Sequence, residues 1–111
     1  MIRVVVTGPP GSGKTTYVRE HCSAGAVVWD ADDVVKAICG AERHQWPGYM
    51  KTVAREMRIA FVRAMMRVVC PELWVIVTDE TKARDVAKQL NASLVEMPCA
   101  ALSSARTVKG I

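Results

Sequence analysis

The chain has 111 residues, half of them hydrophobic and 23% charged, and a formal net charge of +4. This length fits one domain, 1–111, and the apolar content excludes a disordered chain, while the positive charge is compatible with a polyanionic partner. No apolar run approaches the roughly 20 residues that cross a bilayer, and the N-terminus begins directly with a strand pattern instead of a signal peptide, so we expect a cytoplasmic protein.

The N-terminal segment places a phosphate-binding motif between a strand and a helix. Residues 2–7, Ile-Arg-Val-Val-Val-Thr, form the β-branched run that is typical of a buried parallel strand. Residues 8–15, Gly-Pro-Pro-Gly-Ser-Gly-Lys-Thr, match the pattern G-x-x-x-x-G-K-[ST], and a helix is expected from about Gly13. The combination predicts a loop that binds the phosphates of ATP or another NTP; the alternative is a Gly-rich turn without a ligand.

Each residue type in this motif has a chemical use. Glycines let the backbone wrap a polyphosphate with its N–H groups pointing inward. Lys14 is expected to reach the β- and γ-phosphates, and the Thr15 hydroxyl is expected to ligate Mg²⁺. The predicted nucleotide-binding set is Gly8, Pro10, Gly11, Ser12, Gly13, Lys14, Thr15 and Thr16.

The middle of the chain is expected to form a strand, a short helix, a loop and a long helix. The strand covers 26–29, the short helix ends near Gly40, and Gly and Pro residues mark 40–49 as a loop. Apolar residues with a period of 3.6 predict the long helix over about 50–69. Its expected inner face consists of Val53, Met57, Ala60, Phe61, Ala64 and Val68. Its basic residues, expected on a solvated face, are Lys51, Arg55, Arg58, Arg63 and Arg67.

The last third of the chain continues the alternation. Strands are expected at 73–78 and 92–97 with a helix at 81–90 between them, and the last dozen residues are expected to fray or to form one short helix. The pattern predicts a three-layer α/β fold with a mainly parallel sheet of strand order 2-3-1-4. Such folds bind ligands beyond the carboxyl ends of their strands, where the motif and the acidic residues below all fall.

Two groups of acidic residues follow strands. Asp79 stands where a magnesium-site carboxylate is usual, although it also suits the N-cap of the next helix. Residues 30–33, Asp-Ala-Asp-Asp, contain three carboxylates in four positions. At least one of them is expected to act on a cation or a proton, with helix capping as the alternative for the others. Arg43, in the loop, and Asp30 are candidate acceptor contacts.

These residues together resemble the phage-type polynucleotide kinases and their P-loop kinase relatives. The shared features are Gly-x-Pro-Gly-Ser-Gly-Lys, an Asp-Asp pair about 18 residues beyond the lysine, and a strand that ends in an aspartate, within residues 1 to about 97. The resemblance implies that Asp32 is the base that accepts the proton of the attacking hydroxyl, with Lys14 as its catalytic partner. It implies γ-phosphoryl transfer from ATP, with Mg²⁺ at Thr15 and Asp79, to a nucleoside, nucleotide or nucleic-acid 5′ end. The resemblance also implies a phage gene, whose product would act in the cytoplasm of the host cell.

The chain departs from the family pattern in its basic residues. Ala31 and Val35 replace two basic residues beside the acidic pair, and only Arg106 and Lys109 follow in place of an arginine-bearing lid. We therefore expect a reduced or absent lid. Without an arginine of its own at the site, the enzyme would be slow, would borrow one from a second subunit of a homo-oligomer, or would only bind nucleotide. Two other functions remain open: an NTPase that drives a nucleic-acid or protein partner, with Glu80 activating water, and a nucleotide-binding module with little catalysis.

Overall fold

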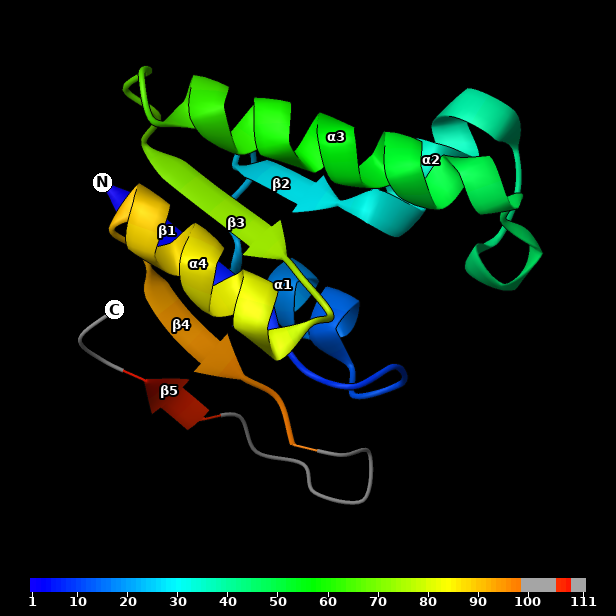
Figure 1. Ribbon diagram of the computed structural model, residues 1–111. Coiled ribbons are helices and arrows are strands. Elements are labelled where there is room, and N and C mark those ends of the chain that lie inside the picture. Colours follow the sequence, from blue (N-terminus) through cyan, green and yellow to red (C-terminus); the bar gives the residue numbers. More distant parts are fainter. Residues whose placement is uncertain (99–105, 109–111) are drawn as a thin grey trace.

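The computed structural model describes residues 1–98 and 106–108 (Figure 1). Helices and strands alternate through the first four strands, as the sequence predicts. The elements are β1 (Ile2–Thr7), α1 (Lys14–His21), β2 (Val27–Asp30), α2 (Ala31–Cys39), the 3₁₀ helix η1 (Arg43–Gln45), α3 (Gly48–Met65), β3 (Glu72–Ile76), α4 (Glu80–Leu90), β4 (Ser93–Glu96) and β5 (Arg106–Val108).

The strands form one sheet of order β2-β3-β1-β4-β5. The first four are parallel, so the predicted order 2-3-1-4 is confirmed. The fifth strand pairs antiparallel with β4, and the expectation of a frayed end or a helix is wrong for 106–108. Strand β5 covers the edge of the sheet at β4, and this pairing of distant segments leaves no periodic pattern in the sequence. The reduced lid was expected beyond β4, where 99–105 and 109–111 lie outside the described residues.

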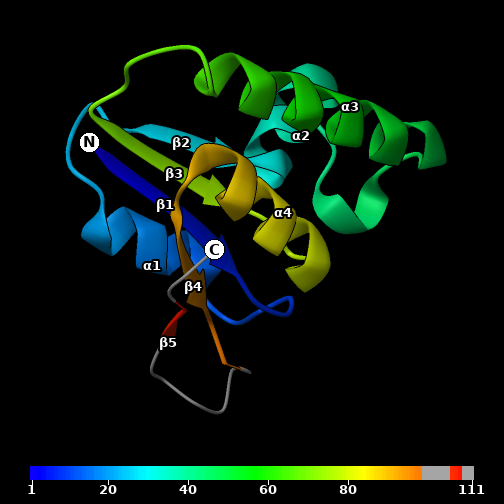
Figure 2. The ribbon, with the colours of Figure 1, turned by 60° about the vertical axis from the view of Figure 1, so that its left-hand side comes forward.

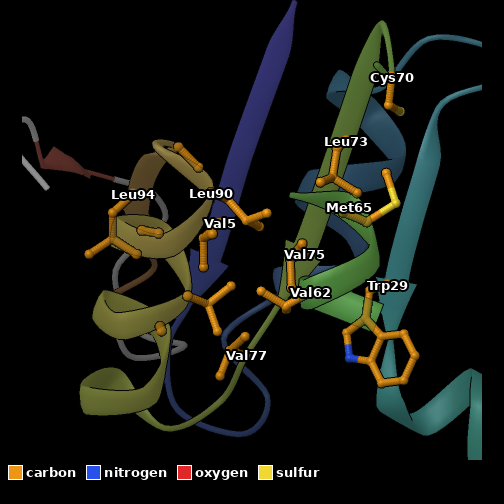
Figure 3. Packing of buried hydrophobic residues seen from close by; sticks show 14 residues of the cluster. Val5, Trp29, Val62, Met65, Cys70, Leu73, Val75, Val77, Leu90 and Leu94 are labelled. Atoms are coloured by element: carbon orange, nitrogen blue, oxygen red, sulfur yellow. The ribbon is translucent and has the colours of Figure 1, made fainter. Parts of the chain in front are cut away.

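Helices cover both faces of the sheet, which gives the three layers that were predicted. Figure 2 shows α1 on one face and α3 with α4 on the other. Side chains alternate between these faces: Val5 packs toward α4, whereas Val6 packs toward Val18 of α1. The larger cluster joins Val5, Leu73 and Leu94 of the sheet to α4 (Figure 3). The four apolar residues of α4, spaced for one face of a helix over 81–90 as the sequence predicts, are all buried: Ala83, Val86, Ala87 and Leu90.

Helix α3 differs from the prediction in its length and in its buried face. It begins two residues earlier and ends at Met65, because the chain must turn to bring Pro71 beside Ile2, whose N–H donates to the Pro71 carbonyl at 2.8 Å. The predicted inner face is correct for Met57 and Phe61, which are half-buried and pack against the core. It is wrong for Val53, Ala60, Ala64 and Val68, which are exposed. The buried residues are Met50, Ala54, Val62 and Met65. Apolar residues occur on more than one face of the helix, so the sequence alone does not identify the buried face. Packing against the rest of the protein decides which face is buried.

Helix α2 begins earlier than the apolar pattern predicts. Asp30 ends β2 and is the N-cap of α2, where its Oδ1 accepts a hydrogen bond from the backbone N–H of Asp32 at 3.0 Å. Asp32 and Asp33 therefore lie in the first turn, where the helix dipole favours negative charge. Gly40 ends the helix with a φ of 75°, as predicted. Among the described residues, no helix has the length and hydropathy of a membrane span.

Candidate functional site

A cavity of about 940 Å³ lies at the carboxyl ends of the strands. Residues from five parts of the chain line it: the loop before α1, the β2–α2 junction, the η1 segment, α3, and the β3–α4 junction. The motif residues Lys14 and Thr15 therefore share one cavity with Asp32 and Asp79. These groups therefore meet at one edge of the sheet, where the sequence analysis expected them.

The loop over 8–13 has the backbone of an anion-binding turn. Gly11 and Gly13 have φ angles of 77° and 86°, which side-chain-bearing residues rarely adopt. A Cβ at either position would meet no described atom within 4 Å, so the conformation, and not crowding, requires glycine there. Helix α1 begins at Lys14 with Gly13 as N-cap, and no side chain of the described residues caps it. Its first N–H groups are thus available to a phosphate.

The side chain of Lys14 closes over this loop. Its Nζ donates to the carbonyl oxygens of Gly8 at 2.8 Å and Pro9 at 3.0 Å. Burial lowers the pKa of Lys14 and Arg43 lowers it further, while the carboxylates of Asp32 and Asp30 act in the opposite direction. An ammonium group held at the cavity wall by two backbone oxygens needs only a small movement to bind a phosphate oxygen.

Ser12 carries an unpaired polar atom inside the same loop. Its Oγ is buried and has no hydrogen-bond partner among the described residues. Buried hydroxyl groups nearly always have a partner in folded proteins, so an orphaned one in a phosphate-binding motif is consistent with a missing ligand. Ser12 is one of the predicted nucleotide-binding residues, and its assignment stays a prediction.

Gly8 should not tolerate a side chain. A Cβ there would lie 2.8 Å from the Cβ of Met97 and 2.9 Å from the Met97 carbonyl oxygen. Gly8→Ala should therefore lower the free energy of unfolding by about 1–3 kcal/mol, the usual cost of overpacking. Gly48→Ala is the control, because no described atom lies within 4 Å of its added Cβ. Urea denaturation of both variants measures the difference, and equal stabilities would contradict the close approach of the loop to Met97.

Thr15 is hydrogen-bonded to Asp30. The Thr15 Oγ1 donates to Asp30 Oδ2 at 3.1 Å, and Asp30 is only 7% exposed. Burial raises the pKa of Asp30, while the backbone N–H of Asp32 opposes the shift. A hydroxyl and a carboxylate side by side are the hard oxygen ligands that suit Mg²⁺. The sequence analysis assigned Asp30 to the acceptor instead, because spacing alone does not show that the end of β2 reaches the start of α1.

Asp79 lies at the β3–α4 junction, beside the cavity. It is the N-cap of α4, and its Oδ1 accepts from the backbone N–H of Lys82 at 3.0 Å. The capping alternative for Asp79 is therefore correct. One carboxylate oxygen is occupied by the cap, and the residue still lines the cavity that contains Thr15. A capping aspartate can thus also contribute to a metal site.

Asp32 is oriented by the loop residue Arg43. The Arg43 Nη1 donates to Asp32 Oδ1 at 3.2 Å, and its guanidinium lies 5.4 Å from the ring centroid of Trp46. Trp46 packs inward against Val35, Met50 and Ala54, so the loop that carries Arg43 is fixed to the α2–α3 pair. Both predicted acceptor contacts, Asp30 and Arg43, line the cavity.

The sequence analysis missed the contribution of α3. Lys51, Arg55 and Arg58 line the cavity, although they were expected on a solvated face. Their spacing of four and three residues is the signal that places them on one stripe of a helix. The sequence did not show that this stripe faces the cavity, because four of the six residues assigned to the inner face of α3 are exposed.

Comparisons with known proteins agree with this fold. No curated protein matches the chain. A chain of the solved Pnkp1/Rnl/Hen1 complex matches in structure with a TM-score of 0.55 and 15% identity over 86% of this chain. The match covers 34% of that chain, so the present protein spans about a third of its length, and the likeness is one of fold. The family model described as AAA domain matches residues 4–103. The chain therefore belongs to this AAA domain family of P-loop proteins.

Proposed function

We propose that the protein is an ATP-dependent phosphotransferase that moves the γ-phosphoryl group to a hydroxyl or phosphate of a nucleoside, nucleotide or nucleic-acid 5′ end. The observation that supports this best is Asp32, a carboxylate that is not used by the phosphate loop but lines the same cavity as Lys14. A general base near the γ-phosphate site is what transfer to a hydroxyl requires.

The residues divide the chemistry between them. The loop over 8–13 and Lys14 bind the phosphates, and Thr15 with Asp30 and Asp79 would hold Mg²⁺, which neutralises phosphate charge when bound. Asp32 accepts the proton of the acceptor hydroxyl. The acceptor oxygen then forms a bond to the γ-phosphorus, the bond to the bridging oxygen breaks, and its electron pair leaves with ADP.

Hydrolysis driven by Glu80 is less well supported. Its carboxylate pairs with Arg84 Nη2 at 2.9 Å, and Arg84 also contacts Glu96 Oε1 at 2.7 Å. Glu80 is not among the residues that line the cavity, unlike Asp32. A water-activating carboxylate must face the γ-phosphate, so the geometry favours transfer over hydrolysis.

Labelled ATP tests the proposal directly. The protein is incubated with γ-labelled ATP and Mg²⁺ in the presence of nucleosides, nucleotides, 5′-hydroxyl DNA, 5′-hydroxyl RNA or buffer alone. Label on an acceptor supports the phosphotransferase, and the acceptor that receives it identifies the substrate class. Free phosphate alone would indicate an NTPase, and binding without turnover would indicate a nucleotide-binding module.

Substitutions at Asp79 separate its two roles. Asp79→Ala should lower the stability of the fold by about 1 kcal/mol, whereas Asp79→Ser, which retains a capping oxygen, should leave it unchanged. Both variants should weaken ATP binding in the presence of Mg²⁺ and leave it unchanged in EDTA, because both lack the carboxylate. Urea denaturation and nucleotide titration measure these effects. Normal Mg²⁺-dependent binding by Asp79→Ser would show that Asp79 only caps α4.

A further inference from the structure

Helix α3 directs three basic side chains toward the cavity. Lys51, Arg55 and Arg58 lie on one stripe of the helix and line the cavity that contains Lys14 and Asp79. The ion pairs within 4.0 Å among the described residues involve other cations: Lys36, Arg43 and Arg84. Within residues 1–98 and 106–108, these three side chains thus bring positive charge to the cavity without an ion pair to a carboxylate.

Arg58 is the most deeply placed of the three. Its side chain is half-buried, whereas Lys51 and Arg55 are exposed. Burial lowers the pKa of Arg58 and the neighbouring Arg55 lowers it further, while Asp79 acts in the opposite direction. An arginine stays charged under all ordinary conditions. A partly desolvated guanidinium next to a second one is therefore stabilised by any anion that enters the cavity.

The position of Asp79 indicates which anion this is. Asp79 follows β3, which is the sheet neighbour of β1, and the Val77 N–H donates to the Val6 carbonyl at 3.0 Å. The end of β1 leads directly into the phosphate-binding loop. Figure 1 shows α3 on one side of the end of β3 and the loop over 8–13 on the other. The loop, Asp79 and Arg58 thus border one cavity, whereas Lys51 lies toward the start of α3.

We propose that Arg58 binds the terminal phosphate of ATP from the side of the cavity opposite the phosphate-binding loop and neutralises its charge during transfer. This inference rests on the proposed function. The planar guanidinium offers two parallel N–H groups to two phosphate oxygens, which a lysine does not. The positive charge that the sequence analysis sought in a lid or in a second subunit is then supplied by α3 of the same chain.

Nucleotide affinities test this role without requiring turnover. Arg58→Met retains the apolar stem and removes the charge, and Arg63→Met is the matched control, since Arg63 is an exposed residue of α3 outside the cavity lining. Arg58→Met should weaken ATP binding roughly 10- to 100-fold, the loss of one or two charged hydrogen bonds, with ADP binding unchanged. Arg63→Met should change neither affinity. Arg58→Lys should recover part of the loss.

The outcomes separate this inference from the proposed function. Equal losses for ATP and ADP, or no loss for either, would overturn the role of Arg58. A selective loss of ATP affinity in a protein that phosphorylates no acceptor would support Arg58 and reject the phosphotransferase. A wild-type chain that binds no ATP would overturn both. If circular dichroism shows that Arg58→Met is unfolded, Arg58→Lys decides the question, and its failure to lower ATP affinity selectively would overturn the inference.

Discussion

Replacing Lys14 by Met should weaken ATP binding by about 100-fold, the largest single loss of affinity that the site predicts. The estimate follows from two charge-assisted hydrogen bonds to phosphate oxygens, each contributing about 1.5 kcal/mol or more. The same Nζ donates to the carbonyl oxygens of Gly8 and Pro9 in the absence of nucleotide. The variant therefore loses two hydrogen bonds within the loop as well as the group that binds phosphate.

One control variant and two measurements separate these losses for Lys14. Lys88→Met removes one positive charge from an exposed position of α4 outside the cavity lining and should leave ATP affinity unchanged. Calorimetric titration with ATP measures the affinity, and urea denaturation measures whether the hydrogen bonds from Lys14 to the loop carbonyls stabilise the fold. If Lys14→Met binds ATP as tightly as Lys88→Met, the phosphate-binding assignment of the loop over 8–15 is wrong.

The phosphate-binding loop and the sheet were predictable because their signals are local. The motif at 8–15 needs a strand before it and a helix after it, and both are visible as residue patterns. The strand order then follows from the topology common to such folds. The inner face of α4 was also predicted correctly, because its four apolar residues leave a single possible stripe.

The opposite side of the cavity was not predictable, because it depends on how distant segments pack. Helix α3 carries apolar residues on several sides, and the selection of its buried stripe is a property of its contacts with the sheet and α2. Once Val62 and Met65 are buried, Arg55 and Arg58 turn toward the cavity. The pairing of Thr15 with Asp30 has the same origin, since it joins the start of α1 to the end of β2.

Replacing Asp32 by Asn should reduce transfer to the acceptor by roughly 10²–10⁴-fold, the usual contribution of a general base, while ATP binding is retained. The amide keeps the shape of the side chain and still accepts a hydrogen bond from Arg43, so the loop that Arg43 anchors should remain in place. What is lost is the capacity to accept the proton of the attacking hydroxyl.

Asp33→Asn is the matched control for Asp32→Asn. Both residues lie in the first turn of α2, so both substitutions remove the same favourable interaction with the helix dipole, about 0.3–1 kcal/mol. Asp33 is exposed and does not line the cavity, whereas Asp32 does. Label transfer measured for the two variants under identical conditions therefore isolates the chemistry of one carboxylate from the stability of the helix. Equal transfer rates would mean that Asp32 contributes only to the fold. Loss of transfer with continued release of free phosphate to water would show that Asp32 acts on the acceptor and not on the nucleotide.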